Sequence, residues 1–161
     1  MTDGIMLPEG ESVDWAKLAA YIDGEGYICL RTEHVGGRSH TLILRIGNTD
    51  PRLTLWLQER FGGTVNRRVA SRNAKHIFYQ WRINGRKAVV LLEKCLPHFV
   101  MKRDQAEIAI AFGKLMGWKI GDGWKKGRTH PKLKDEAIAQ RDVLVMKLKE
   151  VRENSLERIP A

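Results

Sequence analysis

The chain has 161 residues, of which 43% are hydrophobic, so it is long enough for one domain with a buried core and too short for two of ordinary size. Lysine and arginine outnumber aspartate and glutamate by 28 to 19, and the net charge of +9 favours a polyanionic partner such as nucleic acid. No apolar run is long enough to span a membrane and no signal peptide is recognisable, so we expect a soluble intracellular protein, in the cytoplasm or an organelle, with no membrane partner.

A first helix is expected to begin near Trp15, because Ser12 or Asp14 can cap it and apolar residues then recur at helical spacing. The apolar residues on one face of this helix are Trp15, Leu18, Ala19 and Ile22. The glycines within residues 23–26 are expected to end it.

Two β-hairpins are expected, because two pairs of segments carry interleaved apolar and polar residues on either side of a short loop. The segments are residues 27–33 with 41–48, and residues 64–70 with 76–84. Alternation along a strand places apolar side chains on the core face and charged or amide side chains on the opposite face.

Helices are expected between and after the hairpins. Asp50 can cap a helix that has Pro51 at its first position, and two more helices follow the second hairpin, of which the later one runs from about Lys102 to Met116. A basic loop over residues 117–132 then precedes a last helix over 133–153. We therefore predict one α+β domain over residues 1–161 with a core at about 12–116.

Residues 18–26 read LAAYIDGEG and place two carboxylates, Asp23 and Glu25, at the C-terminal end of the first helix. The helix macrodipole disfavours a negative charge there by roughly 0.3 to 1 kcal/mol. A hard divalent cation at that helix end would supply the missing positive charge. The alternative is an acidic turn with no role beyond structure.

This segment resembles the LAGLIDADG signature of homing endonucleases, and the α-β-β-α-β-β-α order over residues 15–116 is similar to the order in that family. The resemblance implies a curved antiparallel sheet that saddles double-stranded DNA, here with an extra C-terminal helix. Only one clear motif is present, so the resemblance implies a homodimer whose signature helices pack at a two-fold axis. The residues expected at that interface are Trp15, Leu18, Ala19 and Ile22.

The resemblance also implies a metal site. Glu25 occupies the position of the acidic metal ligand, assisted by the backbone carbonyl of Gly24, while Asp23 is expected mainly to brace the helix ends. The expected cation is Mg²⁺, with Mn²⁺ as a substitute and with Ca²⁺ supporting DNA binding without cleavage.

Three further residues match catalytic positions of the family. Asn48 stands where an amide orients the water network, Arg52 where a basic residue contacts the scissile region, and Lys102 where the active-site lysine lies. A solvated helix arginine is the equal alternative for Arg52.

Contacts to DNA are expected from the sheet face opposite the helices, because strands can present alternate side chains to base edges in the major groove. The strand residues of this set are Arg31, Glu33, Arg45, Asn66, Arg68, Gln80 and Arg82, and the residues near the hairpin tips are Arg38, His40, Arg72 and Lys75. Solvated strand positions with no ligand are the alternative.

The expected function is that of a site-specific homing endonuclease, which hydrolyses phosphodiester bonds of a long pseudo-palindromic DNA target with a divalent metal. Two alternatives use the same fold, namely a DNA-binding regulator that does not cleave and an RNA-splicing maturase.

Overall fold

The structure is a computed structural model that describes residues 12–33, 39–69, 77–116 and 135–156. The elements are α1 (Ser12–Glu25), β1 (Gly26–Glu33), β2 (Ser39–Asn48), α2 (Pro51–Phe61), β3 (Thr64–Val69), β4 (Ile77–Asn84), α3 (Gly85–Cys95), the 3-10 helix η1 (Leu96–His98), α4 (Arg103–Leu115) and α5 (Asp135–Leu156). The predicted order of helices and strands is confirmed. The predicted basic loop over 117–132 lies outside the described residues.

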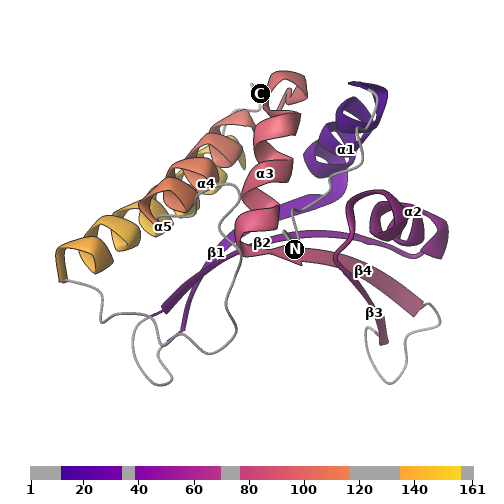
Figure 1. Ribbon diagram of the computed structural model, residues 1–161, viewed down its shortest axis with the longest axis horizontal. Coiled ribbons are helices and arrows are strands. Elements are labelled where there is room, and N and C mark those ends of the chain that lie inside the picture. Colours follow the sequence, from indigo (N-terminus) through magenta and orange to yellow (C-terminus); the bar gives the residue numbers. More distant parts are fainter. Residues whose placement is uncertain (1–11, 34–38, 70–76, 117–134, 157–161) are drawn as a thin grey trace, which may run out of the picture.

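The strands form a four-stranded antiparallel sheet in the order β1-β2-β4-β3, so that the two hairpins join through β2 and β4. Figure 1 shows the helices together on one side of a curved sheet, whose concave side faces away from them. The predicted α+β class and the curved antiparallel sheet are confirmed. No described helix is long and apolar enough to cross a membrane.

The core lies between the helices and the convex face of the sheet. Trp81 pairs in register with Ile46 on one side and Val65 on the other, and its side chain is fully buried. From the helices, Leu57, Leu91 and Phe112 are buried against the same layer. Because strand side chains alternate, burying this set turns the residues between them to the concave face.

The apolar face of α1 packs on the core of its own chain. Leu18, Ala19 and Ile22 have no exposed surface, and Trp15 retains 8%. The prediction that these four residues form a dimer interface is therefore wrong, because side chains already covered by α3 and the sheet cannot contact a second copy. The sequence pattern identified the buried stripe of the helix but not what covers it.

The last helix, α5, packs along α4 through Leu148, which is 1% exposed, and extends to Leu156, past the predicted end at residue 153. It also covers His40 of β2, whose side chain is fully buried and whose Nε2 lies 3.0 Å from Asp142 Oδ1. The prediction that His40 contacts DNA is therefore wrong, because its strand position faces the helices rather than the concave side.

Candidate active site

Glu25 and Asn48 meet where α1 ends and β2 ends. The Asn48 amide Nδ2 donates to Glu25 Oε2 at 2.8 Å, and Asn48 Oδ1 accepts from the backbone N–H of Asp50 at 2.8 Å. The second bond fixes which way the amide points, so that its NH₂ group faces the carboxylate. Glu25 itself is exposed, and its carboxylate is therefore both oriented and accessible.

Gly26 lets the chain turn directly from α1 into β1. A Cβ atom at this position would lie 2.5 Å from Ile22 Cα and 2.7 Å from Ile22 O, closer than a side chain can approach. At Gly24, by contrast, an added Cβ would meet nothing within 4 Å. The glycine at 26 is thus required by the chain's own tight junction, which holds Glu25 at the helix end.

Asp23 is buried and acts as a cap for a distant segment. Its carboxylate accepts from the backbone N–H groups of Val100 (2.8 Å), Met101 (3.2 Å) and Lys102 (2.8 Å). These donors precede α4, whose own N-cap residue makes no side-chain cap bond. The expectation that Asp23 braces helix ends is confirmed.

Lys102 binds backbone oxygens where α1 turns into β1. Its Nζ donates to the backbone oxygens of Ile22 (2.7 Å) and Asp23 (2.9 Å) at the C-terminal end of α1 and of Gly26 (2.7 Å) at the start of β1. Burial lowers the pKa of this ammonium, the charge of Asp23 opposes that shift, and Arg152 adds to it. Lys102 therefore belongs to the site, but its three donors are committed to main-chain carbonyls rather than directed outward.

Arg52 lies at the first turn of α2, with its side chain 88% exposed. Its guanidinium pairs with Asp50, which also accepts from the Arg52 backbone N–H at 2.9 Å and so caps α2 as predicted. The hydrogen bonds from Arg52 lower the pKa of Asp50 to about 2. Arg52, Asp50 and Asn48 line one hollow of about 550 Å³ together with Tyr21 and Trp56.

A second hollow, of about 330 Å³, lies on the concave face beside Glu25. It is lined by Glu25, Tyr27, Arg45, Gly47, Phe78 and Gln80. Directly paired residues of antiparallel strands point to the same side, so the register extends this face outward. The predicted residues that share it are Arg31 and the backbone position of Glu33 on β1, Arg45 on β2, Asn66 and Arg68 on β3, and Gln80 and Arg82 on β4.

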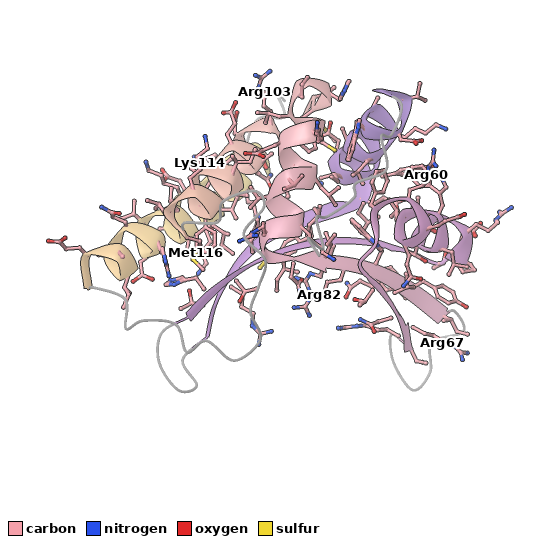
Figure 2. All side chains as sticks on the ribbon, in the orientation of Figure 1. Arg60, Arg67, Arg82, Arg103, Lys114 and Met116 are labelled. Carbon is pink, nitrogen blue, oxygen red and sulfur yellow. The ribbon has the colours of Figure 1, made fainter. Side chains whose placement is uncertain are left out.

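Figure 2 shows Arg82 projecting from the side of the sheet that faces away from the helices. The predicted division of each strand into a core face and a concave face thus agrees with the register. Arg38, Arg72 and Lys75, expected near the hairpin tips, lie outside the described residues.

Tyr27, Phe78 and Arg152 are residues of the site that the sequence pattern did not indicate. Tyr27 and Phe78 share the alternation of Arg31 and Gln80, so strand parity was a usable signal for both. Arg152 had none, since only the packing of α5 brings it to Tyr27, where its Nη1 lies 3.2 Å from the hydroxyl.

The oxygen donors at the end of α1 suit a hard divalent cation. Glu25 offers an exposed carboxylate, while that of Asp23 is used by backbone N–H groups. Within the described residues no three His, Cys, Asp or Glu side chains gather as metal ligands would. Among the acidic side chains at the end of α1, Glu25 is therefore the one whose carboxylate is open to a cation.

Solved structures with the same architecture are homing endonucleases. I-CvuI in complex with its target is 21% identical and superposes with a TM-score of 0.67, covering 91% of this chain and 92% of that one. The archaeal intron-encoded I-Vdi141I complexed with DNA is 14% identical, with a TM-score of 0.67 over 88% and 86% of the two chains. I-TnaI is 20% identical, with a TM-score of 0.61 over 91% and 98%.

The chain has the LAGLIDADG homing-endonuclease fold. No family model matches the sequence, and no curated protein does. In this fold the LAAYIDGEG segment forms the C-terminal part of α1 and its turn into β1, and it places Glu25 at the edge of the concave face.

Proposed function

We propose that the protein is a homodimeric, metal-dependent endonuclease that cuts double-stranded DNA at a specific site. The observation that carries the proposal is the oriented, exposed carboxylate of Glu25 at the edge of an arginine-bearing concave sheet. The DNA complexes of I-CvuI and I-Vdi141I, which share this fold, support the choice of ligand.

The charges of the concave face also support a polyanionic ligand. Arg45 and Arg82 are directly paired across β2 and β4, and like charges in directly opposite positions destabilise a sheet. A phosphate backbone lying along the face would remove that repulsion and release its counterions. Asn66 and Gln80, also paired, add amide groups of the kind that read base edges.

Each residue of the site has a separate role in the proposed phosphodiester hydrolysis. Glu25, with the Gly24 carbonyl, would hold Mg²⁺, for which Mn²⁺ would substitute, and a bound cation supplies water activation and neutralises charge on the leaving oxygen. Asn48 orients the carboxylate through its own fixed amide. Lys102 is a positioning residue that holds the end of α1 and adds positive charge there. Arg52, exposed beside Asn48, is available to a phosphate.

A second copy is proposed to pack on the exposed stripe of α1, not on its buried face. That stripe consists of Val13, Lys17, Ala20, Tyr21 and Gly24, which recur at helical spacing. Val100 and Met101, 87% and 65% exposed, lie beside the same helix end because Asp23 binds their backbone. An apolar surface of this kind on a symmetric oligomer marks a contact, and it would bring two Glu25 carboxylates together.

The test is selection from a randomised DNA library in Mg²⁺ and, separately, in Ca²⁺, with sequencing of the cleaved and the bound fractions. We expect one long pseudo-palindromic site that is cut in Mg²⁺ and only bound in Ca²⁺. Specific binding with no cleavage in Mg²⁺ would instead identify a DNA-binding regulator, and preferential binding of RNA would identify a maturase.

Glu25→Gln assigns the role of the carboxylate. We expect cleavage to fall at least ~100-fold, while DNA binding persists and stability rises slightly, since a charge that opposes the helix dipole is removed. Glu59→Gln, an exposed substitution on α2, is the matched control and should cut normally. Cleavage by Glu25→Gln at the wild-type rate would rule out this residue as the metal ligand.

A further inference from the structure

Tyr27 is the centre of a cluster of two arginines beside the candidate active site. Its ring has the Arg45 guanidinium carbon 4.9 Å from its centroid and the Arg152 guanidinium carbon 4.4 Å from it. Arg152 Nη1 also donates to the Tyr27 hydroxyl at 3.2 Å. Arg45 comes from the sheet and Arg152 from α5, so the cluster exists only because α5 returns to the edge strand β1.

The positive charge of this cluster is not balanced within the described residues. Neither Arg45 nor Arg152 makes an ion pair with a carboxylate there. The Nε atoms of both side chains and Nη2 of Arg152 are buried without a hydrogen-bond partner. An aromatic ring attracts each cation only weakly, and it does not relieve the repulsion between two guanidinium groups. The cluster therefore has positive charge and hydrogen-bond donors that an anion could satisfy.

The cluster lies on the concave face beside Glu25. Tyr27 and Arg45 line the same hollow as Glu25, and Tyr27 is 43% exposed. Arg152 is also close enough to Lys102 for its charge to lower the pKa of that ammonium. An anion bound between the two arginines would thus sit next to the carboxylate that we assign to the metal.

We infer that Arg152 of α5 and Arg45 of β2, arranged around Tyr27, bind a DNA backbone phosphate adjacent to the cleavage site. The inference rests on the proposed function, because it takes DNA as the ligand of the concave face. It gives α5 a part in the active site: the helix brings to β1 a cation that the α-β-β-α-β-β-α core lacks. An arginine is suited to this role, since its planar fork can both stack on the ring and bind phosphate oxygens.

The test measures how DNA affinity depends on salt. Wild type, Arg152→Gln, Arg152→Lys and Lys149→Gln are titrated with a fluorescently labelled random-sequence DNA duplex in Ca²⁺ over a range of salt concentrations. Glutamine keeps much of the side-chain length and a donor for Tyr27 while removing the charge. Lys149 is exposed on the same helix and loses the same charge, so it is the matched control. Circular dichroism checks that each variant folds.

Each phosphate contact contributes about 0.9 to the slope of log affinity against log salt. We expect Arg152→Gln to reduce the slope by about 1.8 in a dimer, Arg152→Lys to restore most of it, and Lys149→Gln to leave it near wild type. Equal slopes for Arg152→Gln and Lys149→Gln would overturn the inference and leave Arg152 as a tether of α5. The salt slope is measured without cleavage, so the two proposals can fail separately. If Arg152→Gln has the reduced slope but the wild-type protein does not cut DNA, the proposed nuclease is contradicted and the phosphate site is not.

Discussion

At the scale of single residues, Asp23 and Lys102 form a reciprocal cap. The carboxylate of Asp23 binds backbone N–H groups just before α4, and the ammonium of Lys102 binds backbone carbonyls at the end of α1. Each side chain thus supplies the charge that the other helix end lacks. Glu25, placed between Asp23 and Gly26, derives its position from this pair, so that the carboxylate proposed to hold the metal is free of a structural task.

Asp23→Ala tests this reading. We expect a loss of about 2 to 4 kcal/mol in the free energy of unfolding, because three backbone donors lose a charged acceptor. Urea denaturation of wild type, Asp23→Ala and the control Glu107→Ala measures the free energy of unfolding. Glu107 makes an exposed ion pair with Arg103, so Glu107→Ala should cost under about 1 kcal/mol. Similar losses in the two variants would mean that Asp23 is not a structural cap.

At the scale of elements, the start of α2 is fixed by local chemistry. Asp50 accepts from the Arg52 backbone N–H, Pro51 occupies the first turn, and the Arg52 guanidinium pairs with the same carboxylate. The side chain of Asn48 joins this capping segment, because its Oδ1 accepts a hydrogen bond from the backbone N–H of Asp50. The helix start and the orientation of the Glu25 partner are therefore set by one short segment.

The pairing of Asp50 with Arg52 predicts how Asp50 titrates in acid. The pKa of Asp50 is lowered from 3.8 to about 2, so between these values the unfolded chain binds more protons than the folded one. The stabilisation from Asp50 should therefore be complete above about pH 4 and be lost as the pH falls through 2. NMR titration of the carboxyl carbon should give a pKa near 2 in wild type and a higher one in Arg52→Gln. A wild-type pKa near 3.8 would contradict the pairing.

At the scale of the whole molecule, the sheet and α1 offer two separate surfaces. The concave face carries the arginines and the hollow beside Glu25, whereas the exposed stripe of α1 carries Ala20, Tyr21 and Gly24. One surface suits a polyanion and the other a closely approaching helix, since small residues allow backbones to come near each other. A dimer built on the second surface would extend the first across both chains.

Gly24→Leu separates dimer formation from folding. Nothing lies within 4 Å of a Cβ at Gly24, and leucine favours helix by up to about 1 kcal/mol over glycine, so the fold should be kept. A leucine there would hold a second α1 away, and sedimentation should show a monomer with little DNA cleavage. Ala111→Leu, on the exposed side of α4, should stay dimeric. A dimeric Gly24→Leu variant would exclude the α1 stripe as the interface.

Much of the architecture was predictable because it depends on periodicity and local capping. The alternation of the strands and the Asp50 cap sufficed for the element order and the concave-face residues, and the resemblance of the LAAYIDGEG segment to the LAGLIDADG signature singled out Glu25 and Asn48, which the structure places in contact. These features depend on short-range patterns that any fold of this class must satisfy.

Burial and long-range contacts were decided by tertiary structure alone. The sequence pattern of an apolar helical stripe is the same whether the stripe packs on its own core or on a partner. For this reason the sequence predicts a dimer interface at Trp15 and Ile22, whereas the structure buries both in the core of their own chain. The sequence predicts His40 at a hairpin tip facing DNA, but β2 already begins before it and α5 covers that end of the strand. Arg152 meets Tyr27 across 125 residues of sequence, and no local pattern encodes a contact between elements so far apart in the chain.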